Sequence, residues 1–413
     1  MPLRETTTAR ATAAGAAPAP TGPRHASSGP GGGRFRALRG ALVLAWPALA
    51  VYALVRITGT AFIAWRAGDD GPGLGKLFAS RFDTVYYVHI ADNGYEAPLA
   101  EGCAVQGELC TYAFFPAYPA LIRGFSAVLP LPTGTVAWGI SVAASLVAAW
   151  GIFAVAEQLI DRRTAVFAVA LWGVVPHAVV QQLAYTESLF TAVSAWALYA
   201  VVRRHWLTAA ALACLAGLTR PSGAAVVAAV VLCAAWALFT AVRKGTGGRT
   251  ALAAAILIAP LGWFFWFARV GYRAGRWDGY FRLQERWGST FDGGGFTADR
   301  IAEVFTKQPT HLNTVVATVT VLGALLLLLL CALDRQHAPL LIYSAFLLLI
   351  AAGGAGYFHS KARFLLPAFP LLFPLARALA TARPRAAYTV LGAVVLLSSA
   401  YGGYLLLVWK YSP

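Results

Sequence analysis

Charged side chains are scarce in this 413-residue chain. Asp, Glu, Lys and Arg together make up 12% of it, and only 17 residues are acidic. A soluble globular protein carries roughly a quarter charged residues. Hydrophobic residues reach 59%, and the mean hydropathy is +0.63. This composition excludes an ordinary soluble domain and predicts an all-α, polytopic membrane protein.

Several motifs of soluble enzymes are missing as well. The chain has no Gly-rich phosphate loop, no dinucleotide fingerprint and no Ser-His-Asp arrangement, so we do not expect a nucleotide-sugar donor. No spacing predicts a metal site. Asp83 and Glu187 could offer oxygen ligands to Mg²⁺ or Mn²⁺, but nothing in the sequence requires a metal. The net charge of +16 indicates basic cytoplasmic loops facing anionic lipid rather than a nucleic-acid partner.

Residues 1–33 differ from the rest of the chain. They are rich in Ala, Pro, Gly, Ser and Thr and lack the apolar content of a core, which predicts a disordered cytoplasmic tail. They do not read as a signal peptide, because no apolar segment follows a basic one there. Residues 34–413 are expected to form a single transmembrane domain. The preference for Arg over Lys, with abundant Ala and Gly, indicates a GC-rich bacterial genome such as that of an actinobacterium.

Apolar segments of about 20 residues, the length that spans a bilayer, predict about eleven transmembrane helices. They lie near residues 37–64, 135–160, 165–184, 187–203, 206–220, 222–242, 250–270, 311–332, 338–356, 363–380 and 386–409. Short basic loops follow every second segment, at residues 161–163, 203–205, 243–249, 334–337 and 382–385. The positive-inside rule places these loops and the N-terminus in the cytoplasm of a multi-pass plasma-membrane protein.

This alternation of inner and outer loops requires that residues 113–129 do not cross the membrane. The prolines of FPAYP and the charge of Arg123 favour a short, surface-lying helix there over a full crossing. The outer face then receives five segments with unusual polar motifs. They are the large first loop 65–134, the turn 185–188, residues 219–223, the loop 271–310 and residues 359–363. Arginines on this disfavoured side need an anionic partner, such as a lipid headgroup or a lipid-linked phosphate.

The first outer loop contains the run RFDTVYYVHIADNGYE, residues 81–96, with a carboxylate among aromatic side chains. On a helix, one face would carry Asp83, Tyr86, Tyr87 and Ile90. Gly94 would end that helix. Aromatic neighbours would shelter the carboxylate, which suits a catalytic general base. The alternative is that Asp83 only caps the helix, because Asp is a preferred N-cap residue.

The other polar residues of the outer loops allow two interpretations each. Glu187 either favours the N-terminal dipole of a helix or contacts substrate. Arg220 either ends a span at the interface or binds phosphate. The cluster of His359, Lys361 and Arg363 either snorkels to the interface or cradles a phosphate. Gln284 and Trp287 belong either to an interfacial aromatic belt or to a sugar or polyprenyl contact. Cys103 and Cys110 could form a disulfide, since the outside is oxidising.

Five motifs resemble one known family. RFDTVYYVHIADNGY is similar to the W-D-x-x-W-Y-x-x-I-A-x-x-G-Y pattern of the PIG-V type, GPI mannosyltransferase 2-like proteins and their bacterial branch. FFPAYPALIR, AYTESLF, LTRPSG and RFLLPAFPLLF resemble four further motifs of that family. All five occur in order between residue 81 and about residue 373. The chain departs from the pattern at Phe82, where the family usually has Trp, and at Ser222, where it often has Asn.

The resemblance implies a GT-C type glycosyltransferase, which uses a polyprenyl-phosphate sugar donor on the outer face. In such enzymes an acidic residue of the first outer loop acts as the base, and by position this residue is Asp83. We therefore expect transfer of mannose or a related hexose to an extracytoplasmic glycolipid, lipoglycan or protein acceptor. A secondary transporter or a flippase for polyprenyl-linked glycans is the alternative. It would show internal repeats and ionisable residues at mid-membrane, of which Arg56 is the main example here.

Overall fold

The computed structural model describes residues 30–68, 71, 73–97, 109–307 and 310–413. Residues 1–29 of the predicted tail and Cys103 lie outside the described residues. The chain divides into two compact units, residues 1–44 and 45–413. The first unit contains the beginning of helix α1, and the second contains the rest of α1 and every other element.

Nearly all of the regular structure is α-helical, as the composition predicts. The longer helices are α1 (Pro30–Ala67), α5 (Thr133–Leu159), α9 (Gly223–Arg243), α14 (Leu312–Leu333) and α18 (Pro384–Leu407). Those of intermediate length are α3 (Thr84–Asn93), α4 (Ala117–Ser126), α6 (Arg162–Trp172), α7 (Glu187–Val202), α8 (Trp206–Gly217), α10 (Arg249–Ile258), α11 (Leu261–Arg273), α13 (Gly295–Thr306) and α15 (Ala338–Gly353).

Short elements connect these helices. They are α2 (Leu74–Ala79), α12 (Gly279–Arg286), α16 (Lys361–Phe364), α17 (Phe373–Thr381) and the 3₁₀ turns η1 (Cys110–Ala113), η2 (Ala178–Gln182), η3 (Phe358–Ser360) and η4 (Phe369–Leu372). Two short strands, β1 (Thr290–Phe291) and β2 (Gly354–Ala355), pair antiparallel, with Thr290 opposite Ala355 and Phe291 opposite Gly354. This ladder ties the loop 271–310 to the segment that follows α15.

Six helical segments within the described residues are long and apolar enough to cross a membrane. They are Arg39–Ala67, Thr133–Leu159, Gly223–Arg243, Arg249–Arg273, Leu312–Leu333 and Pro384–Leu407. A pair bent by 80°, Phe358–Phe364 with Phe369–Thr381, would make a seventh. The polytopic α-helical fold is thus confirmed. The number of eleven stays a prediction, because the remaining apolar segments form shorter helices or are interrupted.

The predicted span 165–184 is one of the interrupted segments. Helix α6 ends at Trp172, and the 3₁₀ turn η2 follows after Pro176, a residue that cannot continue a helix. Arg56 of α1 donates a hydrogen bond of 2.6 Å to the carbonyl of Ala178 and a second to the carbonyl of Gly173. The buried charge of Arg56 therefore binds carbonyl groups that the broken helix leaves free.

Residues 117–126 form a short helix, as expected. Helix α4 has ten residues and is therefore about 15 Å long, against a hydrocarbon core of about 30 Å. Its face with Tyr118 and Ile122 is buried, and the Tyr118 hydroxyl donates to the carbonyl of Ala137 in α5 at 2.7 Å. The helix therefore packs against α5 and is too short to cross the hydrocarbon core of a membrane.

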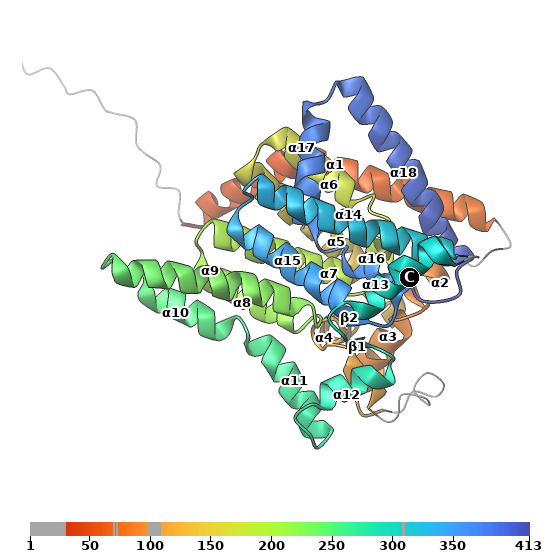
Figure 1. Cartoon of the computed structure of the whole chain (residues 1–413), viewed down its shortest axis with the longest axis horizontal. Helices are drawn as coiled ribbons and strands as arrows, with labels where there is room; N and C mark the ends of the chain where they lie inside the picture. Colours follow the sequence, from red (N-terminus) through yellow and green to blue (C-terminus); the bar gives the residue numbers. More distant parts are fainter. Residues whose placement is uncertain (1–29, 69–70, 72, 98–108, 308–309) are drawn as a thin grey trace, which may run out of the picture. The chain divides into compact units, whose positions relative to one another are not determined.

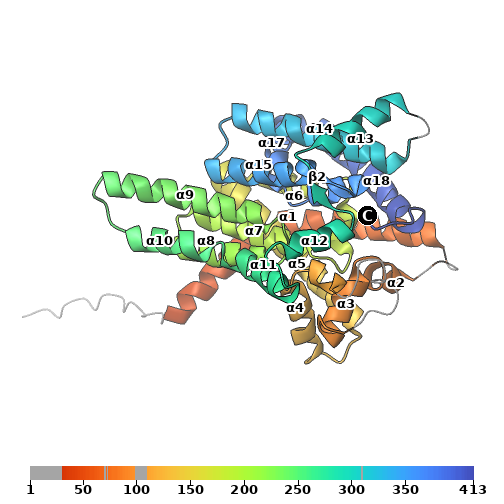
Figure 2. The same cartoon turned by 60° about the horizontal axis from the view of Figure 1, so that its bottom comes forward.

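The connections of the bundle separate toward two ends. In both views the α9–α10 and α14–α15 connections, which carry basic residues, lie away from α2, α3, β2 and the C-terminus (Figure 1, Figure 2). We call the end that carries α2, α3, β2 and the C-terminus the site end. Three hydrogen bonds hold its loops together: Ala184 N to Phe78 O at 3.0 Å, Ala117 N to Leu218 O at 3.0 Å and Arg81 Nη1 to Leu406 O at 2.7 Å.

Candidate active site

Asp83 lies at the start of α3, at the site end. The residue before it, Phe82, has a φ of +55°, a left-handed conformation that is strained for a bulky side chain. The Asp83 backbone N–H donates to the hydroxyl of Tyr185 at 3.2 Å. Within the described part of the chain, the Asp83 carboxylate makes no capping hydrogen bond to α3. Its side chain is 26% exposed, so it remains accessible to a ligand.

The partner of Asp83 is Arg363 of α16. Nη1 of Arg363 lies 2.9 Å from Oδ2 of Asp83. Ser412, near the C-terminus, joins the pair: its hydroxyl donates to Oδ1 of Asp83 at 3.2 Å and accepts from Nη1 of Arg363 at 3.0 Å. The guanidinium also lies over the ring of Tyr185, 5.4 Å from its centroid. The structure therefore brings together two residues that the sequence analysis had selected in separate motifs.

Glu187, the first residue of α7, extends this arrangement. Its side chain is only 2% exposed, and its Oε1 lies 2.5 Å from Nη1 of Arg220 and 3.4 Å from Nε of Arg363. Arg220 also donates to Oγ1 of Thr186 at 3.1 Å. A buried carboxylate is tolerated only when cations and hydrogen bonds compensate it. Four side chains of alternating charge, Asp83, Arg363, Glu187 and Arg220, thus form what we call the charge row.

The geometry of the charge row leaves little room for the Mg²⁺ or Mn²⁺ ion that Asp83 and Glu187 could have bound. Asp83 and Glu187 face the same guanidinium, that of Arg363, so a divalent cation between them would have to displace it. Across the described residues, no three His, Cys, Asp or Glu side chains form a group that could hold a metal ion. The row as it stands fits an anionic ligand better than a metal.

Aromatic side chains line α3 beside Asp83. The ring of Tyr86 stacks on Phe114, with centroids 4.6 Å apart, and meets Trp287 edge-on at 5.3 Å. Tyr87 is buried, contacts Phe114 edge-on, and its hydroxyl lies 3.3 Å from Oγ1 of Thr186. Burial, followed by the nearby charge of Asp83, raises the pKa of Tyr86. We call Tyr86, Tyr87, Phe114 and Trp287 the aromatic wall.

Two predicted ligand-binding residues lie apart from the charge row. Gln284 donates from Nε2 to the hydroxyl of Tyr280 at 2.9 Å, within α12. Lys361 is 1% exposed and donates to the carbonyls of Ala351 at 2.7 Å and Gly354 at 2.6 Å. The Lys361 ammonium therefore satisfies carbonyl groups at the C-terminal end of α15.

His359 has a third environment. Its ring lies 5.6 Å from that of Trp409 and 6.3 Å from that of Tyr411. The side chains of His359, Lys361 and Arg363 thus have different partners, and a phosphate cradle formed by all three stays a prediction. Gly94 ends α3 with a φ of +84°, as the sequence predicted.

Four residues of the site were not selected from the sequence. Tyr185 and Thr186 belong to the AYTESLF motif, directly before Glu187, and a polar pair beside a buried carboxylate could have drawn attention to them. Phe114 belongs to FFPAYP. Ser412 carried no signal, because its role depends on where the C-terminal segment folds back.

The predicted disulfide falls partly outside the described residues. Cys110 is buried and disulfide-bonded, whereas Cys103 is not described. The pairing of these two residues stays a prediction. Cys214, Cys233 and Cys331 are free thiols, as their positions in apolar segments led us to expect.

Comparisons with known proteins bear on the fold. No protein-family model and no curated protein matches the chain. Among solved structures, the chain is similar to ArnT from Cupriavidus metallidurans bound to undecaprenyl phosphate, with a TM-score of 0.51 and 14% identity. It is also similar to apo ArnT from Cupriavidus metallidurans, with a TM-score of 0.50 and 16% identity. The matches cover 85% and 86% of this chain but 63% and 62% of the ArnT chains, so the chain spans less than two thirds of ArnT.

At these identities the similarity shows the fold alone. This chain shares the α-helical fold of ArnT over 85% of its length. The predicted fold class is therefore confirmed.

Proposed function

We propose that the chain is a membrane glycosyltransferase that moves mannose or a related hexose from a polyprenyl-phosphate donor to an extracytoplasmic acceptor. The observation that carries the proposal is the partly exposed Asp83 carboxylate, held by Arg363 at one end of a GT-C type bundle. ArnT, which shares this fold, has been solved with undecaprenyl phosphate, and this supports the donor class. The five motifs that resemble PIG-V type proteins support mannose.

Asp83 acts as the general base in this proposal. It accepts the proton of an acceptor hydroxyl as the hydroxyl oxygen attacks the anomeric carbon of the donor sugar. The bond between that carbon and the phosphate oxygen breaks, and the polyprenyl phosphate leaves with the bonding electrons. The products are the glycosylated acceptor and polyprenyl phosphate, and Asp83 then releases its proton to water. The hydrogen bonds from Arg363 and Ser412 fix the orientation of the carboxylate.

Arg363 and Arg220 stabilise the phosphate as negative charge develops on it. The described contacts of Arg363 with Asp83, Ser412 and Glu187 use Nη1 and Nε, so the two N–H groups of Nη2 are available to a phosphate oxygen. Because guanidinium groups bind phosphate with directed hydrogen bonds, arginine suits this role better than a point charge would. Glu187 keeps both arginines in place.

The aromatic wall provides the surface next to the base. Tyr86 follows Asp83 by three residues and is only partly buried, and aromatic surfaces of this kind pack against sugar rings or isoprenoid units. The resemblance to PIG-V type proteins also supports an active site on the outer face of the membrane. Glycolipid, lipoglycan and protein acceptors all fit this placement.

The direct test is a transfer assay on membranes that contain the protein. Undecaprenyl-phosphate [³H]mannose is added, and label that moves to lipid, lipoglycan or protein fractions is measured against membranes without the protein. The proposal expects protein-dependent transfer of label from the polyprenyl phosphate. Absence of transfer with mannose, glucose and galactose donors, together with absence of undecaprenyl-phosphate binding, would contradict it.

The proposed orientation has its own test. Single cysteines are introduced at Arg243 and at Arg286 of a variant without Cys214, Cys233 and Cys331. A membrane-impermeant maleimide applied to intact cells should label the cysteine at position 286 and leave the one at position 243 unlabelled. The reverse pattern would place the charge row on the cytoplasmic side.

A further inference from the structure

A groove of about 400 Å³ lies between α1, α6 and α18. Val51 of α1, Phe167 of α6 and Tyr388 of α18 line it, together with Arg162 and Arg163, the first two residues of α6. The rings of Phe167 and Tyr388 stack, with centroids 6.4 Å apart, so α6 and α18 form adjoining walls. Because both arginines and Tyr388 are exposed, the groove opens to the surface. We call it the arginine groove.

The arginine groove lies far from the site end. Tyr388 and Leu406 are both part of α18 and are 18 residues apart, which corresponds to about 27 Å along the helix axis. Leu406 accepts a hydrogen bond from Arg81 at the site end. Since the hydrocarbon core of a membrane is about 30 Å thick, the groove and the site end lie near opposite membrane surfaces.

The two guanidinium groups have no partner among the described residues. No ion pair or side-chain hydrogen bond joins Arg162 or Arg163 to another residue of the described part of the chain. The adjacent carboxylate, that of Asp161, accepts from the backbone N–H of Thr164 at 2.9 Å and from its hydroxyl at 2.6 Å. Asp161 therefore caps α6 and leaves both arginines available to an anion.

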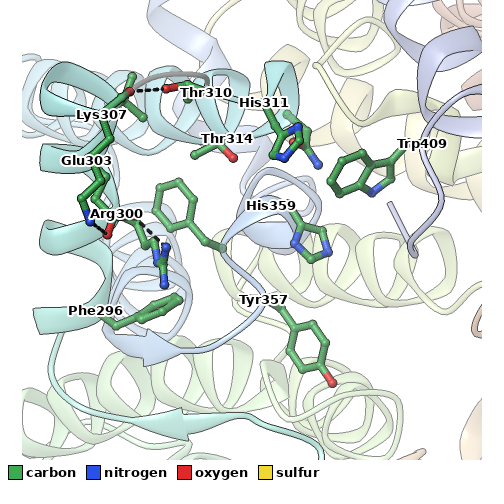
Figure 3. Close-up of a pocket in the computed structure, with 13 residues that line it drawn as sticks. Phe296, Arg300, Glu303, Lys307, Thr310, His311, Thr314, Tyr357, His359 and Trp409 are labelled. Atoms are coloured by element: carbon green, nitrogen blue, oxygen red, sulfur yellow. Dashed lines mark hydrogen bonds and ion pairs between the residues drawn. The ribbon is translucent and has the colours of Figure 1, made fainter.

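The cavity between α13, the start of α14 and the C-terminal segment differs in this respect. Its volume is about 450 Å³ (Figure 3). There Glu303 accepts from Arg300 at 2.7 Å and from Lys307 at 2.8 Å. An anion would have to displace Glu303 in that cavity, whereas in the arginine groove no described carboxylate occupies the cations. The arginine groove is therefore the better anion site of the two.

The rest of the arginine groove is mainly apolar. Val51, Phe167 and Leu391 line it, and both α1 and α18 contain segments long and apolar enough to span a membrane. Leu54 and Leu396, further along these two helices toward the site end, are 64% and 62% exposed. Apolar walls offer nothing to a soluble anion, whereas they bury the acyl chains of a lipid. The groove thus suits an amphiphile with an anionic headgroup.

We infer that the arginine groove binds an anionic phospholipid, with its phosphodiester at Arg162 and Arg163 and its acyl chains along α1 and α18. Guanidinium groups donate directed hydrogen bonds to phosphate oxygens. Basic pockets between transmembrane helices bind such headgroups. In the orientation proposed above, the lipid belongs to the cytoplasmic leaflet, whose surface is anionic. This lipid site is separate from the charge row and does not depend on the proposed transfer reaction.

The test measures lipid binding to the full-length protein by native mass spectrometry in a non-ionic detergent. Phosphatidylglycerol and phosphatidylcholine with the same acyl chains are titrated, and the Kd of the first bound lipid is determined. We expect phosphatidylglycerol to bind more tightly. Each arginine contributes about fivefold to the affinity for an anionic lipid surface, so Arg162→Gln combined with Arg163→Gln should raise the Kd of phosphatidylglycerol at least tenfold. The Kd of the zwitterionic phosphatidylcholine should stay within about twofold.

Two control variants locate the site. Arg243→Gln combined with Lys244→Gln removes the same charge from the α9–α10 connection, which also lies away from the site end. Arg363→Met removes a guanidinium group of the charge row. Because neither change touches the arginine groove, the Kd of phosphatidylglycerol should stay within about twofold of the wild-type value in both.

Several results would overturn the inference. One is equal affinity for the two lipids, or an unchanged Kd of phosphatidylglycerol in the Arg162 and Arg163 double variant. An equally large loss in the Arg243 and Lys244 double variant would assign binding to diffuse surface charge, and the same loss in Arg363→Met would assign it to the charge row. Displacement of phosphatidylglycerol by inorganic phosphate at constant ionic strength would show that the arginines bind a free anion without help from the apolar walls.

Discussion

Asp83 and Arg363 are 280 residues apart in the chain and form an ion pair, with Nη1 of the arginine 2.9 Å from Oδ2 of the carboxylate. The same guanidinium has its Nε 3.4 Å from Oε1 of Glu187. One cation therefore positions both an accessible and a buried carboxylate. Substitution of Glu187 should therefore mainly lower the stability of the protein, whereas substitution of Asp83 should mainly lower the rate of sugar transfer.

Glu187→Gln should destabilise the protein. The substitution removes the buried charge that Arg220 and Arg363 share, and breaking a buried ion pair costs about 3 kcal/mol or more. Thermal unfolding of the purified protein measures the loss. Glu285→Gln is the matched control, because its partner Arg282 and Glu285 itself are about half exposed, and it should cost less than about 1 kcal/mol. Equal losses in the two variants would contradict the account of Glu187.

Lys361→Met should affect stability without affecting the donor. The Lys361 ammonium binds the carbonyls of Ala351 and Gly354, and removing hydrogen bonds from a charged group costs about 2 kcal/mol. Arg363→Met removes a proposed phosphate ligand and should weaken undecaprenyl-phosphate binding at least tenfold. Both variants are compared by thermal unfolding and by binding of undecaprenyl phosphate. A tenfold loss of undecaprenyl-phosphate binding in Lys361→Met would instead indicate that Lys361 binds the phosphate.

The loop around Glu96 should lose protection against hydrogen exchange at acidic pH. A hydrogen bond from Tyr112, together with the nearby charges of Arg273 and Arg269, holds the pKa of Glu96 below its ordinary value of 4.5. A lowered pKa contributes stability that is present above 4.5 and is lost as the pH falls through the folded-state value. Since Glu96 is exposed, the effect is local and small. Hydrogen exchange of residues 109–113 should accelerate between pH 5 and pH 3, beyond the intrinsic change, and Glu96→Gln should abolish this difference.

Asn313→Leu should leave the free protein as stable as the wild type or more stable. A buried amide without a partner costs about 1 kcal/mol or more, and Leu has a similar volume without the polar atoms. The melting temperature in the absence of sugars is the measurement. A clear decrease would mean that the Asn313 amide stabilises the folded protein.

Local features of the sequence predicted much of the site. Tyr86 and Tyr87 lie on a helix that begins directly after Asp83 and ends at Gly94, because helical spacing and a C-terminal glycine act within a few residues. The short helix at residues 117–126 follows in the same way from its prolines.

Pairings between distant segments could not be predicted. The sequence selected Arg363, Lys361 and Glu187 by residue type, but the direction of each side chain depends on how α15 and α16 pack. Lys361 turns to the end of α15, while Arg363, two residues later, turns to Asp83. The interruption after Trp172 was missed for a similar reason, since Arg56 of another helix binds the carbonyl groups that it frees.

The most direct test of the central claim is the rate of a single turnover in Asp83→Asn. The asparagine side chain can still accept a hydrogen bond from Arg363, and its site is partly exposed, so the melting temperature should fall less than in Glu187→Gln and undecaprenyl-phosphate binding should match that of the wild type. Asp278→Asn, at a loop ion pair in which the arginine is half exposed and the carboxylate partly buried, is the matched control and should transfer label at the wild-type rate. General-base catalysis by Asp83 predicts that transfer from undecaprenyl-phosphate mannose falls at least a hundredfold, within the roughly 10²–10⁴-fold range of such catalysis. Transfer by Asp83→Asn within threefold of the wild-type rate would contradict the assignment of Asp83 as the base.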